Sequence, residues 1–150
     1  MSWWSRLLGG KSSAGPRSGR VDYLKEAIAL ERTGDFDAAL TSYRLALREQ
    51  PNDPRILQNI AIAYSRTGRL EEAIRSYRRA LDVAPTLSGA HYGLAFLLLK
   101  RGDRAGAMQH LDSFLAQAPG DPEAQRWVQH AEQTLAALRA GGDVTANPEG

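Results

Sequence analysis

The spacing of apolar residues near the start of the chain predicts a helix. Between residues 21 and 32, Leu24, Ala27 and Ile28 lie three or four positions apart, which places side chains on one face of an α-helix. A half-buried strand would instead alternate apolar and polar residues. We therefore expect an amphipathic helix in this segment, with one face available for packing.

A turn and a second helix are predicted to follow. Gly34 comes after the first helix, where glycine adopts the positive φ that ends many helices without steric cost. Asp35 is placed to cap a second helix, whose apolar residues run from Ala39 to Leu47. Pro51 ends that helix, because proline cannot continue one. The unit is thus predicted to be two helices joined by a short turn.

The same marks return every 34 residues. Four series keep this period through three copies: Ala27, Ala61 and Ala95; Gly34, Gly68 and Gly102; Ala39, Ala73 and Ala107; Pro51, Pro85 and Pro119. A fixed period of this length indicates a stack of identical helical units. Such a stack is built to present a surface rather than to enclose a reaction.

These marks resemble the tetratricopeptide repeat family, a 34-residue helix–turn–helix with small residues at positions 8 and 20, an aromatic residue at 24, Ala at 27 and Pro at 32. The third copy departs from this pattern, with Leu111 at position 24, Phe114 at position 27 and Arg104 at position 17. We expect Leu111 and Phe114 to conserve volume as an exchanged pair, and the start of the helix at Arg104 to be weak. The resemblance covers residues 20–121.

The resemblance implies an all-α fold, a helix–turn–helix repeat solenoid of three tetratricopeptide repeats plus a C-terminal capping helix. The expected repeats are 20–53, 54–87 and 88–121, within a domain spanning 20–140. Residues 122–139 carry one more amphipathic helix, which would cover the last seam of the stack. We expect 141–150 to be a disordered tail.

Residues 1–19 are expected to form a flexible basic tail. Its first eight residues are MSWWSRLL, and Trp3, Trp4, Leu7 and Leu8 would share one side of a two-turn helix, with Arg6 adding positive charge. Three uses compete for this segment. It could lie on an anionic membrane surface, dock into a second protein, or fold back into the groove of its own repeat domain.

The charge of the chain is concentrated at its beginning. The first 20 residues carry four basic side chains and no acidic one, whereas the remainder carries fifteen basic and seventeen acidic side chains. A nucleic-acid-binding domain would place its excess of Lys and Arg on one face of the fold. Nucleic acid is therefore not expected as a partner.

Composition also bounds the compartment. The chain has no cysteine, so disulfides and thiolate metal sites are excluded. It shows neither an apolar run long enough to span a membrane nor the apolar stretch of a secretory signal. We expect a cytoplasmic protein, with peripheral membrane association as one use of the tail.

Catalytic chemistry is not predicted. His91, His110 and His130 fall in three different expected helices and at three different repeat positions, so no pair has the spacing of metal ligands on one helix. We expect satisfied seam or surface histidines, no metal, no cofactor and no enzyme activity.

The resemblance implies that the first helices of the repeats line a concave groove that binds a partner. The implied groove residues are Leu24, Ile28, Arg55, Gln58, Asn59, Ile62, Tyr92, Phe96, Leu99, Arg126 and Trp127. Exposed aromatic side chains at Tyr92 and Phe96 would favour binding, whereas Ile62, Phe96 and Leu99 could instead pack between neighbouring first helices. Of the five positions at which chaperone-binding members grip a terminal carboxylate, only Asn59 keeps the family residue.

The predicted function is a non-catalytic adaptor or scaffold that binds a protein or peptide segment through apolar anchors in the groove. The tail would localise the protein or recruit a second partner. The alternative is a self-assembling scaffold, a homo-oligomer formed through the repeats or the tail.

Overall fold

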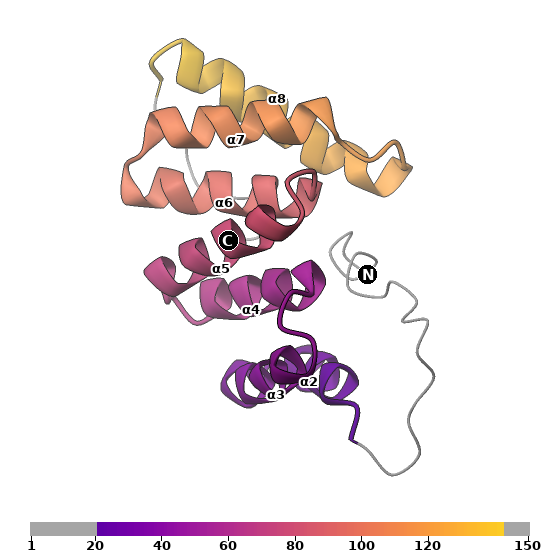
Figure 1. Cartoon of the computed structure of the whole chain (residues 1–150). Coiled ribbons are helices and arrows are strands. Elements are labelled where there is room, and N and C mark those ends of the chain that lie inside the picture. The colour runs from indigo at the N-terminus through magenta and orange to yellow at the C-terminus, as the bar shows by residue number, and fades with distance from the viewer. Residues whose placement is uncertain (1–20, 143–150) are drawn as a thin grey trace.

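The computed structural model describes residues 21–142 of the chain. Within that part it contains α-helices and one short 3-10 turn, and no strand. The elements are α2 (Tyr23–Arg32), α3 (Phe36–Glu49), α4 (Pro54–Arg66), α5 (Leu70–Val83), α6 (Ser88–Arg101), α7 (Arg104–Ala116), η1 (Pro122–Ala124) and α8 (Gln125–Arg139). Figure 1 shows them stacked in chain order, from α2 and α3 at one end to α8 at the other.

Aspartates begin most of these helices, because a carboxylate can accept hydrogen bonds from the first backbone N–H groups. Asp35 accepts from Ala38 N at 3.2 Å, and Asp53 accepts from Arg55 N at 2.9 Å. Asp22 caps α2, so this helix begins at Tyr23 and Val21 lies outside it, 55% exposed. The segment expected to be helical from residue 21 is therefore shorter at its start.

The turn between the two helices of each repeat uses a glycine with positive φ. Gly34, Gly68 and Gly102 have φ of 83°, 76° and 88°. Residues with a side chain rarely adopt this conformation, which explains why glycine recurs at this position. The three repeats therefore reverse direction by the same turn.

The core is a row of seams between consecutive helices, as expected for a stack. The small residues of the period lie in these seams: Ala27, Ala39, Ala61, Ala73, Ala95 and Ala107 are all 0% exposed. They form parts of three successive apolar clusters, one for each region of the stack. Small side chains at these positions let the paired helices approach closely.

The departures in the third repeat are accommodated within its seam. Leu111 and Phe114 are both 0% exposed, and the Phe114 ring lies edge-on to Tyr92, with the ring centroids 5.1 Å apart. Asp103 caps α7 by accepting from Gly106 N at 2.9 Å. The start of this helix, expected to be weak, thus has the side-chain cap that α5 lacks.

The final helix closes the stack. Asp121 accepts a hydrogen bond from Ala124 N at 2.8 Å, and a 3-10 turn at 122–124 leads into α8. Trp127, Leu135 and Leu138 are buried against the preceding repeat. The prediction of an all-α repeat solenoid is confirmed. The predictions for Trp3, Trp4, Arg6, Leu7 and Leu8, and for residues 143–150 of the predicted tail 141–150, lie outside the described residues.

Candidate protein-binding surface

The predicted site residues come from the first helix of each unit and from the final helix. We call this set the first-helix surface; it draws on α2, α4, α6 and α8. Its members are Leu24, Ile28, Arg55, Gln58, Asn59, Ile62, Tyr92, Phe96, Leu99, Arg126 and Trp127, together with His130 of the same final helix.

An aromatic cluster joins α6 to α8. The Tyr92 ring lies edge-on to Trp127, with centroids 5.4 Å apart, and its hydroxyl lies 3.0 Å from His130 Nδ1. The Phe96 ring stacks on His130 at 4.8 Å between centroids. Sequence reasoning noted His130 as a member of the last helix but found no signal for these contacts, because they join residues 34 to 38 positions apart.

The expectation of exposed aromatic side chains at Tyr92 and Phe96 was wrong. Tyr92 is 0% exposed and Phe96 is 4% exposed. Both rings belong to the apolar cluster that also holds Trp127, 3% exposed. The reason is that side chains from neighbouring first helices pack on one another, which was the alternative considered for Phe96.

The aliphatic residues of the set fall into two groups. Ile62 and Leu99 are half-buried and pack against the aromatic cluster, so α4, α6 and α8 share a continuous apolar region. Leu24 and Ile28 are also half-buried, but they pack against the first cluster, around Tyr43. The structure therefore does not place Leu24 and Ile28 in the same cluster as the aromatic residues.

Two amides are buried on α4 beside the apolar region. Gln58 is 1% exposed and Asn59 is 0% exposed. Gln58 Nε2 and both amide atoms of Asn59 lack a hydrogen bond of good geometry. Asn59 nevertheless lies near the Tyr43 hydroxyl, close enough to act against the rise in the pKa of that phenol. Asn59 therefore faces Tyr43 of the preceding repeat rather than solvent.

Asn59 lies beside a pair formed by the buried phenol of Tyr43 and the half-buried carboxyl of Glu31. The Tyr43 hydroxyl donates to Glu31 Oε2 at 2.5 Å. Burial, followed by the charge of Glu31 and this hydrogen bond, raises the pKa of Tyr43. Burial also raises the pKa of Glu31, while the hydrogen bond from Tyr43 and the charge of Arg66 oppose that rise. The pair is thus arranged as a neutral donor and its acceptor.

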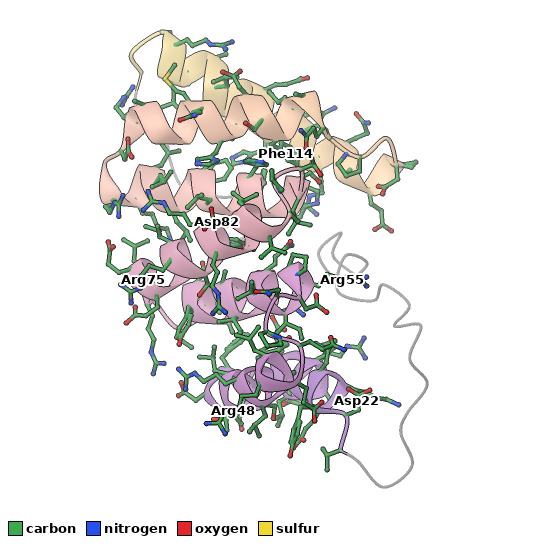
Figure 2. The ribbon with its side chains drawn as sticks, in the orientation of Figure 1. Asp22, Arg48, Arg55, Arg75, Asp82 and Phe114 are labelled. Carbon is green, nitrogen blue, oxygen red and sulfur yellow. The ribbon has the colours of Figure 1, made fainter. Side chains whose placement is uncertain are left out.

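Two arginines of the predicted set are exposed. Arg55, which is labelled in Figure 2, lies in the first turn of α4. Arg126 is exposed at the start of α8, with its guanidinium carbon 4.9 Å from the centroid of the Trp127 ring. This distance fits a cation–π contact. Phe114 of α7, also labelled in Figure 2, is by contrast buried in the same apolar cluster as Tyr92 and Trp127.

The other two histidines meet across the seam between α6 and α7. His91 Nδ1 and His110 Nδ1 are 3.0 Å apart, and His91 Nε2 lies 2.8 Å from the Pro85 carbonyl oxygen. Because that oxygen only accepts, His91 Nε2 carries the proton and donates, which leaves His91 Nδ1 to accept from His110. The expectation of satisfied seam histidines is confirmed for this pair, although its contact was not foreseen.

Residues 21–142 show no cluster of three or more His, Cys, Asp or Glu side chains arranged to hold a metal ion. In the same residues, no helix combines the length and apolar character needed to cross a bilayer. The surface offers a partner its half-buried aliphatic side chains and its two exposed arginines, because the aromatic rings and the two amides are buried.

Two models of one family match the chain, both described as tetratricopeptide repeat. One covers residues 24–88 and the other covers 67–130. The chain belongs to the tetratricopeptide repeat family. No curated protein gives a significant match.

Solved structures share this fold. The type III secretion chaperone SycD of Yersinia enterocolitica, in complex with a peptide of the translocator YopD, is 18% identical with a TM-score of 0.74, covering 83% of this chain and 98% of that one. PcrH, in complex with the chaperone binding region of PopD, is 22% identical with a TM-score of 0.71, covering 86% and 100%. The Sgt2 TPR domain of Aspergillus fumigatus is 25% identical with a TM-score of 0.67, covering 89% and 93%.

Proposed function

We propose that this protein is a non-catalytic adaptor that binds a segment of a partner protein on the first-helix surface. The observation that carries the proposal is the set of half-buried aliphatic side chains on three first helices: Leu24 and Ile28 on α2, Ile62 on α4 and Leu99 on α6. SycD and PcrH, each solved in complex with a segment of another protein, support the same use of the fold.

Apolar side chains of the partner would supply most of the affinity. Ile62 and Leu99 are half-buried at the edge of the aromatic cluster, and Leu24 and Ile28 are half-buried on α2. Removing a Leu- or Phe-sized side chain from water contributes roughly 1.5–3 kcal/mol. A few such contacts, less the cost of ordering a peptide, give an affinity on the order of micromolar. Leu24 and Ile28 occupy positions at which family members that bind a terminal carboxylate have polar residues. An apolar segment is therefore favoured over a terminal carboxylate.

The N-terminal tail has its own role in the proposal. In a cytoplasmic adaptor, a localisation or docking element would be formed by Trp3, Trp4, Arg6, Leu7 and Leu8.

The second candidate function is a scaffold that assembles with copies of itself. Mass measured by light scattering over a range of protein concentrations separates the two, because only the assembler gains mass on concentration.

The experiment that tests the adaptor uses Ile62→Asp, which places a charge at a half-buried aliphatic position of α4. We expect peptides selected from a displayed random library on the full chain to bind this variant more weakly, with circular dichroism showing that the helices remain. Gln129→Met, at an exposed position of α8, is the control and should leave binding unchanged. Library peptides that bind the Ile62→Asp variant and the unchanged chain equally well would contradict binding on the first-helix surface.

A further inference from the structure

We propose that the first eight residues of the chain bind to the first-helix surface and compete there with the partner segment. This inference rests on the proposed function, because both ligands would use the same half-buried aliphatic side chains of the first helices. It makes the N-terminal segment an internal inhibitor of the binding site. The alternatives, a membrane surface or a separate partner, become outcomes of the test.

The chemistry of the segment matches that of the surface. Its sequence, MSWWSRLL, places four large apolar side chains within six residues. The surface offers half-buried aliphatic side chains on three first helices: Leu24 and Ile28 on α2, Ile62 on α4 and Leu99 on α6. These positions are spread along the stack, so they suit a ligand with several apolar anchors rather than one.

The connection to the domain has a suitable length. Twelve residues, 9–20, separate Leu8 from Val21, and seven of them are Gly or Ser. A chain of this length and composition has an end-to-end distance of roughly 17–21 Å and reaches at most about 40 Å. The described chain begins beside α2, which is itself part of the first-helix surface. With neighbouring helices packed 8–10 Å apart, α6 lies on the order of 20 Å from α2.

Charge separates this docking from membrane binding. Two of the acidic residues lie beyond residue 142, so residues 21–142 carry fifteen basic and fifteen acidic side chains. The described domain therefore has no net charge to attract the four cations of residues 1–20. Docking through apolar contacts should hardly respond to salt, whereas attraction to an anionic membrane should weaken as ionic strength rises.

The test uses a fluorescent synthetic peptide of residues 1–8 and two forms of the full chain. We expect the peptide to bind the Trp3→Ala, Trp4→Ala double variant, whose own segment is disabled, at least about ten-fold more tightly than it binds the unchanged chain, because a tethered competitor has an effective concentration near millimolar. Adding Ile62→Asp to the double variant should abolish binding, with circular dichroism showing that the helices remain. Gln129→Met, added in the same way, should not.

The outcomes are distinguishable. Equal binding to the double variant and the unchanged chain would overturn the inference, and so would loss of the difference on dilution, which would show that a second copy supplies the segment. If the peptide binds neither form while library peptides still bind in an Ile62-dependent way, the inference fails and the proposed function stands. If neither the peptide nor any library peptide binds, both fail. If the segment binds vesicles of anionic lipid and does not compete with any library peptide, it belongs to a membrane-binding site instead.

Discussion

The ring of Tyr77 on α5 fills the space that a side chain at Gly93 on α6 would need. A Cβ atom added at Gly93 would lie 2.4 Å from both Cζ and the hydroxyl oxygen of Tyr77. Corresponding positions in the neighbouring seams hold different pairs: Tyr43 and Asn59 before it, Leu111 and Trp127 after it. In the first two pairs the larger residue is the tyrosine of the second helix, whereas in the third pair it is Trp127 of the following helix. Each seam is therefore filled by a pair of residues rather than by one.

Gly93→Ala should destabilise the protein by about 1–3 kcal/mol, because the added methyl group overpacks the seam against Tyr77. Chemical denaturation measures the change. Gly120→Ala is the control; its added methyl group meets nothing within 4 Å, and its effect should stay within about 0.5 kcal/mol. In a Tyr77→Leu background the cost of Gly93→Ala should shrink. An undiminished cost there would show that the contact with Tyr77 is not its cause.

Ala73→Leu should also be costly, by about 1–3 kcal/mol, because Ala73 is 0% exposed between the two helices of the middle repeat. Thermal unfolding followed by circular dichroism is a sufficient measurement. Ala136→Leu, at an exposed position of α8, adds the same atoms where there is room. Similar losses at the two positions would contradict the arrangement of the seams described above.

The same position in successive repeats offers a comparison of helix caps. Asp103 caps α7, whereas Arg69 at the corresponding position of α5 makes no side-chain cap. Asp103→Ala should cost about 1 kcal/mol. Arg69→Ala removes only an exposed ion pair with Asp37 and a contact with the Tyr64 ring, so it should cost less than about 1 kcal/mol. Equal losses would mean that the cap at Asp103 contributes nothing of its own.

Stability should fall in mildly acidic solution. Burial lowers the pKa of His110, as do His91 and Arg78, while Asp103 acts in the opposite direction; burial also lowers the pKa of His130. A histidine with a lowered pKa binds fewer protons in the folded state than in the unfolded state. Its contribution is therefore complete above the ordinary value of 6.5 and is lost as the pH falls from there through the folded pKa.

The measurement for that prediction is the free energy of unfolding from pH 8 to pH 5. His110→Gln and His130→Gln should each reduce the slope below pH 6.5, whatever they do to the absolute stability. The raised pKa of Glu31 acts with the opposite sign, from its ordinary value of 4.5 upwards, so Glu31→Gln should steepen the loss. A slope unchanged in both histidine variants would remove these groups as its origin.

The sequence by itself determined the period, the helical pairs and the turns between them. Gly34 requires positive φ, Asp35 caps and Pro51 stops a helix, and each of these effects acts within a few neighbouring residues. Local effects of this kind can be read from local sequence. Their repetition at a fixed period then specified the family.

Only the tertiary structure decided which side chains of the first helices are covered. Tyr92 and Phe96 have the positions of surface residues in their own repeat, yet they are buried because Trp127 and His130 arrive from α8. The contact between His91 and His110, and the burial of the amides of Gln58 and Asn59, depend in the same way on other helices. Burial and hydrogen bonding belong to pairs of residues from different elements, and spacing within one helix carries no information about its neighbour's side chains.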